Sequence, residues 1–302
     1  MTSPSTGAEI AVLADRGVVR VAGEDAAKLL QGVITNDMDL LSARPAIFAA
    51  LLAPQGKILF DFFVAKTADG FLLEAAADKT ADLAKRLSMY KLRAKVAIED
   101  CPHYRVFALW GGTPDICGDR AGAVSFRDPR LTALGVRLLA AAQFAPAIGA
   151  EKQVREASAE DYHAHRIALG VPEGGKDYAF GDAFPHEADL DQLHGVSFSK
   201  GCFVGQEVVS RMQNRASVRK RVMPVVGDAP LQAGAEVVAG AAVIGTVGSV
   251  AGVHALALVR LDRAAEAAGK GDRLMAGGVV IALKKPDWAS FELAPAVAAG
   301  AS

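Results

Sequence analysis

Short apolar runs and stretches of helical spacing alternate along the first part of the chain. Two apolar runs, residues 9–13 and 17–21, flank a short polar turn and predict a β-hairpin. Apolar residues then recur at helical spacing over residues 26–30, and Gly32 predicts the end of that helix because glycine is favoured at helix C-termini. The pattern therefore mixes strands with helices.

A second hairpin and a second helix follow. Residues 47–53 and 58–65 are rich in apolar side chains and flank Pro54 to Lys57, whose proline and glycine suit a tight reversal. Asp78 is placed to cap a helix whose apolar positions recur through Tyr90.

The middle of the chain contains a connection, a helix and a long loop. Residues 143–157 combine proline, glycine and charge, which is typical of a connection. Ser158 to Asp161 resembles a capping box that opens a helix, and Gly170 predicts its end. Residues 173–195 are rich in glycine, proline and acids and predict a loop long enough to serve function.

The pattern changes from about residue 222 onward. Short β-branched runs alternate with glycine turns, which predicts a small β-barrel-like domain. The whole chain is thus expected to be an α+β protein. Its predicted parts are a disordered N-terminus at 1–8, a main module of two intertwined subdomains at 9–222 with a connection near 143–157, a β-barrel-like domain at 223–290 and a flexible tail at 291–302.

Composition and charge exclude several classes of partner. The chain has 302 residues, 51% of them hydrophobic and 22% charged, an ordinary balance for a globular protein. Its net charge of -1 gives no overall attraction to nucleic acid or to a membrane. The longest apolar stretches have the length of strands, and the first residues show no secretory leader. We expect a soluble cytoplasmic protein without a membrane or direct nucleic-acid partner.

The strongest chemical signal is the segment Lys200-Gly201-Cys202-Phe203-Val204-Gly205-Gln206-Glu207. A helical pattern follows Cys202, and both a helix N-terminus and Lys200 would favour the thiolate form of this cysteine. Gly201 and Gly205 lack a Cβ, so backbone or a ligand can approach closely. These features predict a reactive thiol at Cys202. The alternative is a small buried cysteine that fills a helix start.

This segment resembles the K-G-C-[YF]-x-G-Q-E signature of the YgfZ family. Four further segments resemble motifs of that family in the same order. They are 21–37, with L-Q-G-x-x-T-x-D; 52–61, with L-x-P-Q-G-K; 166–172, with R-x-x-x-G-x-P; and the proline-led loop 184–190.

The resemblance implies a tetrahydrofolate-binding protein with the fold of the aminomethyltransferase GcvT. Such a protein supports assembly or repair of iron–sulfur clusters in client enzymes, including tRNA-modifying ones, so folate and iron–sulfur client or assembly proteins are the implied partners. Cys202, aided by Lys200, would be the essential thiol. The implied folate-binding residues are Asn36, Asp37, Gln55, Asp61, Tyr162, Arg166, Gly201, Gly205, Gln206 and Glu207. Tyr162 fits a place in the hydrophobic core equally well.

Two departures separate this chain from the aminomethyltransferases. Those enzymes carry two adjacent aspartates after the hairpin and a glutamate after the helix arginine, whereas this chain has Phe60-Asp61 and Ala168 at these places. Transfer of an aminomethyl carbon needs a carboxylate to position the folate amine. We therefore expect no classical enzyme. If the chain is enzymatic, the rival is a folate-dependent aminomethyltransferase or another one-carbon transferase.

Other clusters leave open alternatives. The basic residues of 211–221 fit a solvated helix end or a landing site for a partner, and a passive scaffold using this strip would not need Cys202. His163 and His165 are two apart on a predicted helix and point away from each other, so we expect no metal site. Three cysteines cannot supply four thiolates to an iron–sulfur cluster, so the chain would take part in cluster chemistry as a helper or through shared ligands.

Overall fold

The structure, a computed structural model, describes residues 7–112, 118–120, 122–141, 154–214 and 218–292. The chain divides into two compact units that interleave along the sequence. The first comprises Met1–Tyr162 and Leu193–Val208, and the second comprises His163–Gln192 and Val209–Ser302. The predictions of a disordered N-terminus at 1–8, a connection at 143–157 and a flexible tail at 291–302 fall largely outside the described residues.

The first unit contains a five-stranded antiparallel sheet. In spatial order its strands are β3 (Ala46–Leu52), β4 (Ile58–Thr67), β5 (Gly70–Ala76), β2 (Arg16–Ala22) and β6 (Ala97–Asp100). The predicted hairpin around Pro54 to Lys57 is confirmed as β3–β4, in which Ala53 N donates to Lys57 O at 2.8 Å.

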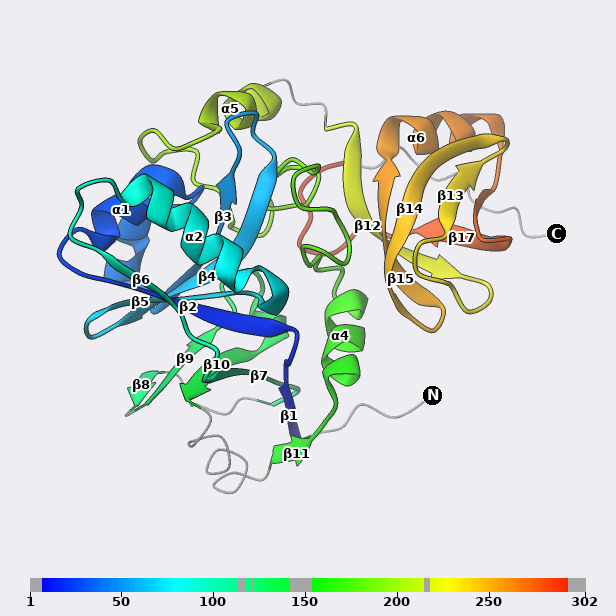
Figure 1. Ribbon diagram of the computed structural model, residues 1–302. Helices are drawn as coiled ribbons and strands as arrows, with labels where there is room; N and C mark the ends of the chain where they lie inside the picture. The colour runs from blue at the N-terminus through cyan, green and yellow to red at the C-terminus, as the bar shows by residue number, and fades with distance from the viewer. Residues whose placement is uncertain (1–6, 113–117, 121, 142–153, 215–217, 293–302) are drawn as a thin grey trace. The chain divides into compact units, whose positions relative to one another are not determined.

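Two helices cover one face of this sheet (Figure 1), α1 (Ala26–Val33) and α2 (Thr80–Lys91). Leu30, Leu83 and Leu87 are fully buried there against strand side chains such as Phe62. Both helices were predicted from the spacing of their apolar residues. Asp78 does not cap α2, because residues Ala77–Lys79 form a 3₁₀ turn that moves the helix start to Thr80.

The other face of the sheet packs on a second, six-stranded sheet. In spatial order its strands are β11 (Val154–Glu156), β1 (Ala8–Val12), β7 (Tyr104–Trp110), β10 (Val136–Ala141), β9 (Ala123–Arg127) and β8 (Gly118–Arg120). The predicted hairpin of residues 9–13 with 17–21 is wrong, since β1 pairs with β7 and β11 while β2 pairs with β5 and β6. The turn between them carries the chain from one sheet to the other.

A buried ion network joins the two sheets. Arg137, 2% exposed, lies 3.6 Å from both Glu74 and Asp128 and donates to the hydroxyl of Tyr162 at 2.6 Å. Arg130 binds Asp128 at 2.7 Å. Burial alone would raise the pKa of Asp128, but the guanidinium groups of Arg130 and Arg137 hold it below its usual value. Tyr162 is fully buried here, in the core of the first unit.

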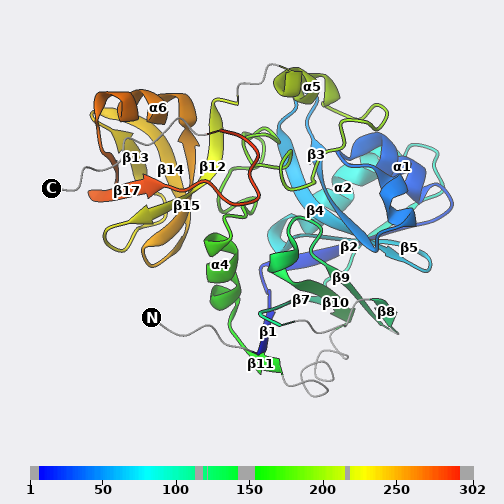
Figure 2. The same ribbon diagram turned by 180° about the vertical axis from the view of Figure 1, so that it is seen from behind.

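The second unit is built around a closed six-stranded barrel (Figure 2). Its strands are β12 (Lys220–Gly227), β15 (His254–Arg260), β14 (Ala242–Ala251), β13 (Glu236–Ala239), β16 (Leu274–Ala276) and β17 (Val279–Leu283). The barrel-like prediction is confirmed. The predicted boundary at residue 222 falls inside β12, and the helix α6 (Leu261–Lys270) was not predicted.

Two helices lie at the points where the chain passes from one unit to the other. In α4 (Ala159–Ala168) the predicted capping box is confirmed, since Asp161 N donates to Ser158 Oγ at 3.1 Å and Ser158 N donates to the Asp161 carboxylate at 2.9 Å. The helix α5 (Gln206–Asn214) follows the cysteine segment. The remaining short 3₁₀ helices are η1 (Met38–Ser42) and η3 (Thr132–Leu134). No helix in the described ranges combines the length and apolar character needed to cross a membrane.

Candidate functional site

Cys202 lies on the exposed surface of the first unit, in the loop that precedes α5. The helix begins at Gln206, so the thiol is four residues before it and outside its first turn. The field of a helix end falls off within the first turn. The prediction that the helix N-terminus acts directly on this sulfur is therefore wrong, although the exposed position excludes the alternative of a buried structural cysteine.

Lys200 has a structural partner far away in sequence. Its ammonium donates to the carbonyl oxygens of Gln31 at 2.7 Å, Ile34 at 2.8 Å and Asn36 at 2.8 Å, and the residue is only 7% exposed. These oxygens lie in the last turn of α1 and directly after it. Because an ammonium has three hydrogens, all of them are used by these bonds. The prediction that Lys200 assists the thiol is therefore corrected: this lysine caps α1.

The cap explains how α1 ends. Helix C-termini leave carbonyl groups without an intrahelical partner, and cations are favoured there. The last turn of α1 has no basic residue of its own, and its C-cap Ile34 is extended. Gly32, the predicted C-terminal glycine, lies inside the helix. Burial lowers the pKa of Lys200 to about 8, which Asp37 and Asp39 oppose. The group therefore remains mainly protonated at neutral pH.

Further hydrogen bonds tie the start of the cysteine loop to the segment after α1. The Thr35 hydroxyl donates to Gly195 O at 2.6 Å and accepts from Ala50 N at 2.8 Å. The amide nitrogen of Asn36 donates to both Phe48 O and His194 O at 2.7 Å. Both amide hydrogens of Asn36 are thus engaged within the chain, which leaves neither for a folate ring.

Two glycines bring the β3–β4 turn against the other end of the cysteine loop. Gly56 has φ +80°, and a Cβ there would lie 2.8 Å from Cβ of Val208. Gly205 has φ +81°, and a Cβ there would lie 2.7 Å from Ala53 O. By contrast, nothing lies within 4 Å of a Cβ built on Gly201. Gly205 is therefore a packing residue, while Gly201 leaves open space beside the thiol.

The other predicted folate residues fall into separate environments. Gln55 is exposed at the tip of the β3–β4 turn, and Asp61 is buried in β4. Asp37 accepts from Gln31 Nε2 at 2.8 Å and from its own loop. Gln206 and Glu207 open α5, where Glu207 is exposed. The structure brings Asp37 together with Asn36 and Lys200.

Arg166 belongs to the second unit and is fully buried there. Its guanidinium donates to Asp177 at 2.6 Å, to Ser249 Oγ at 2.7 Å and to Val171 O at 2.9 Å. These bonds join α4, the loop that follows it and β14. The geometry thus gives Arg166 an internal structural role, and its contact with folate stays a prediction.

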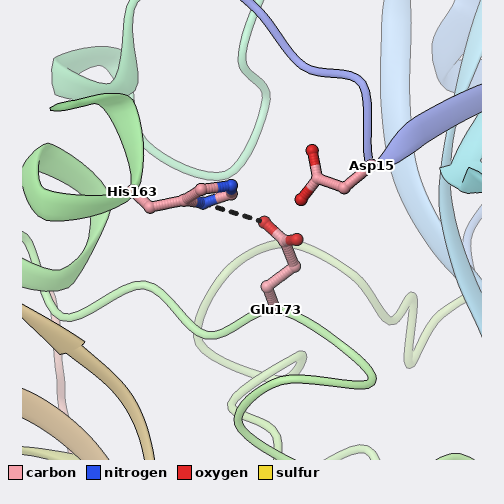
Figure 3. Close-up of side chains that lie close together, drawn as sticks. All are labelled: Asp15, His163 and Glu173. Atoms are coloured by element: carbon pink, nitrogen blue, oxygen red, sulfur yellow. Dashed lines mark ion pairs between the residues drawn. The ribbon is translucent and has the colours of Figure 1, made fainter. Parts of the chain in front are cut away.

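His163 also has charged neighbours within the second unit. Its Nδ1 lies 3.9 Å from Glu173 (Figure 3), and its Nε2 lies 2.9 Å from the ammonium of Lys176. Asp15, the third residue drawn in Figure 3, belongs to the first unit. Within the second unit the imidazole therefore lies between the charged side chains of Glu173 and Lys176.

The basic strip at 211–221 is not one continuous surface. Arg221 is 4% exposed and donates to Asp189 at 2.7 Å and to Asp191 at 2.8 Å, while its guanidinium lies 4.5 Å from the ring centre of Phe291. Arg215 falls outside the described residues. At least one cation of the predicted strip, Arg221, is therefore buried inside the second unit.

Sequence analysis assigned no structural contact to two residues that shape the site. Gln31 accepts from Met38 N and supplies a carbonyl to Lys200, and Thr35 fastens the cysteine loop to β3. Both residues lie in the L-Q-G-x-x-T-x-D segment. Their place in this motif was the sequence feature that could have indicated their structural role.

Comparisons with known proteins place the chain in a family. Residues 219–291 match the model of the CAF17 C-terminal β-barrel domain. The chain is 38% identical over 244 residues to the human mitochondrial iron-sulfur cluster assembly factor IBA57, covering 74% of this chain and 68% of that protein. The chain belongs to the IBA57 family. The mouse protein is 36% identical over 239 residues, with 72% and 66% covered.

The comparisons also test the resemblance to YgfZ and the location. They place the chain among IBA57-like proteins of the CAF17 family. YgfZ is a related member of that family, so the match is to the wider group. The GcvT-like fold is confirmed by the glycine cleavage system aminomethyltransferase T from Bartonella henselae, with a TM-score of 0.77 at 16% identity over 95% of this chain and 88% of that one. The expected cytoplasmic location is contradicted, because the matched IBA57 relatives are named mitochondrial.

Replacing Lys200 tests the helix cap. Lys200→Met keeps most of the aliphatic stem but removes the donor to three buried carbonyls, so we expect the free energy of unfolding to fall by about 2 to 3 kcal/mol. Urea unfolding of the purified chain measures this. Lys28→Met, an exposed lysine on the same helix, should change stability by less than about 0.5 kcal/mol. Equal effects of both variants would contradict the capping role.

The two glycines of the cysteine segment should respond differently to alanine. Gly205→Ala places a Cβ against a backbone oxygen at a positive φ, so we expect a loss of at least about 2 kcal/mol. Gly201→Ala meets open space and should stay within about 0.5 kcal/mol of the parent. Thermal unfolding of both variants compares them, and similar midpoints would contradict the predicted packing of Gly205 on the hairpin.

Proposed function

We propose that this chain is an iron–sulfur cluster assembly factor in which Cys202 is the acting thiol. The observation that carries the proposal is the presentation of this sulfur. Cys202 is exposed, yet its loop is fastened on one side by Lys200 and on the other by Gly205 packed against the β3–β4 turn. Membership of the IBA57 family gives the assignment its chemical context.

A fastened loop suits a thiol that must meet another protein. Ordering a flexible segment on binding costs conformational entropy, about 1 to 2 kcal/mol for each residue fixed. The carbonyl oxygens of His194 and Gly195 already accept hydrogen bonds from Asn36 and Thr35, and the Lys200 side chain binds the end of α1. The chain can therefore offer Cys202 to a partner with little further ordering, while the open space at Gly201 leaves the approach clear.

One chain cannot complete the ligand set of a cluster. Clusters are commonly held by four thiolates. Among the described cysteines, Cys101 is 4% exposed and burial raises the pKa of its thiol, so Cys202 is the accessible one of the two. A cluster that contacts Cys202 would take its other ligands from a second protein, and this favours transfer or shared assembly over permanent storage.

The finer part of the proposal is tetrahydrofolate binding, with client enzymes that include tRNA-modifying ones. It rests on the resemblance to the YgfZ motifs. Asp61 supports it, because a buried carboxylate can accept hydrogen bonds from the amino edge of a pterin. Asn36 and Arg166 support it less, since their donors are engaged within the chain.

Exchange of the thiol tests the main proposal. In cells that lack the native gene, Cys202→Ser should fail to restore the activity of iron–sulfur enzymes, because an alcohol is a far poorer ligand and nucleophile than a thiolate. Cys101→Ser, the matched control, should restore it. Full activity with Cys202→Ser, at equal protein level, would show that the thiol is dispensable and would favour a passive scaffold.

Calorimetric titration with tetrahydrofolate tests the finer proposal. We expect saturable binding, weakened about tenfold by Asp61→Asn, since a charge-assisted hydrogen bond then becomes a neutral one worth about 1.4 kcal/mol less. Arg44→Ala, an exposed change elsewhere in the first unit, should leave the affinity unchanged. Absence of heat at millimolar folate at two well-separated temperatures would exclude folate binding without affecting the role of Cys202.

A further inference from the structure

The last two turns of α2 and the residues after it form a basic surface. Residues 85–93 read Lys-Arg-Leu-Ser-Met-Tyr-Lys-Leu-Arg, with four cations and no acid, in a chain whose net charge is -1. The single acidic residue of α2, Asp82, lies in its first turn. We call the four cations of this segment and its two exposed aliphatic side chains the α2 patch: Lys85, Arg86, Met89, Lys91, Leu92 and Arg93.

Two large apolar side chains stand in the middle of these cations. Met89 is 64% exposed and Leu92 is 87% exposed, the highest values for large apolar residues in the described part of the chain. The helix already buries Leu83 and Leu87 completely against the sheet. Met89 lies two residues beyond Leu87, hence about 200° further round the helix. It therefore points away from the face that Leu83 and Leu87 bury.

Leu92 is also strained. It ends α2 with φ 44° and ψ -109°, a positive φ that is unfavourable for a bulky side chain. Glycine would be favoured at such a helix end. A leucine here increases backbone strain and exposes apolar surface to water, and neither effect helps folding. The residue is therefore better explained by a contact with another molecule.

The cations of the patch have no acidic partner in the described part of the chain. Among the described residues, Lys85, Arg86, Lys91 and Arg93 form no ion pair or side-chain hydrogen bond with one another or with any acid. The neighbouring Lys79 and Lys95, by contrast, pair with Asp78 at 3.3 Å and with Glu24 at 2.8 Å. The helix C-terminus accounts for a cation in the last turn, but it does not account for the two apolar residues among the cations.

We propose that the α2 patch is a docking surface for an acidic protein, whose carboxylates surround an apolar pocket that receives Met89 and Leu92. Methionine and arginine are enriched in protein interfaces, and methionine adapts to irregular pockets. A membrane fits less well, since the main apolar face of α2 is buried in its own unit. A nucleic-acid backbone fits less well because it has no use for two exposed aliphatic groups.

Site-specific photo-cross-linking in living cells tests this docking surface. A photoreactive amino acid at position 89 of the full chain should cross-link to one protein, at a segment that mass spectrometry identifies as rich in Asp and Glu. The double variant Lys85→Glu with Arg93→Glu should reduce the yield at least tenfold. Changing the acids of the mapped segment to lysine should restore it, because the two charges are then exchanged.

Matched controls keep the test interpretable. Arg44→Glu with Lys66→Glu makes the same charge change at exposed positions of the same unit and should retain the cross-link. Thermal unfolding of both double variants should agree within a few degrees, since all four side chains are solvent-accessible. Cross-linking should also survive Cys202→Ser, so this inference stands or falls separately from the role of the thiol.

Several outcomes would overturn the proposal. Cross-links formed mainly to lipid or RNA would show that the patch binds one of these molecules and not an acidic protein. Cross-links to a segment without acids, a yield insensitive to charge reversal, or a yield no higher than from a photoreactive residue at exposed position 243 would refute it.

Discussion

The ammonium of Lys200 determines how the candidate site is built, because it is bound where α1 ends. Three carbonyl oxygens from Gln31, Ile34 and Asn36 surround it, and burial excludes water that could replace it. Removing such a cation would leave the oxygens without their donor, and that penalty is larger than the gain from an ordinary surface hydrogen bond. One charge thus fixes the end of a helix and the start of the cysteine loop together.

The second constraint is the close approach of two chain segments at glycines. Gly56 in the β3–β4 turn and Gly205 after the thiol both have positive φ and leave no room for a Cβ. With Lys200 on one side and Gly205 on the other, Cys202 lies on a short loop held at both ends. Three motif segments that are far apart in sequence, around residues 31–37, 52–61 and 200–207, therefore act as one packing unit. Together they hold the loop that carries the exposed Cys202 at both ends.

Buried arginines provide much of the remaining organisation. In the first unit Arg137 joins two sheets through Glu74, Asp128 and Tyr162. In the second unit Arg166 and Arg221 bind acids of the loop that sequence analysis had assigned to function because of its length. A long polar loop without such partners would be costly to order. Two buried cations therefore help to hold residues 173–192, the part of this loop that belongs to the second unit.

Local sequence determined the elements whose signals are local. The apolar spacing of α1 and α2, the proline–glycine reversal between β3 and β4, the capping box at Ser158 and the short strands of the barrel each depend on residues within about ten positions of one another. The tertiary structure alone decided that β1 and β2 enter different sheets, that Lys200 caps α1 instead of assisting the thiol, and that Tyr162, Arg166 and Arg221 are internal. Each of these outcomes depends on a partner brought close only by folding. A lysine beside a cysteine in sequence therefore does not reveal where its charge will point.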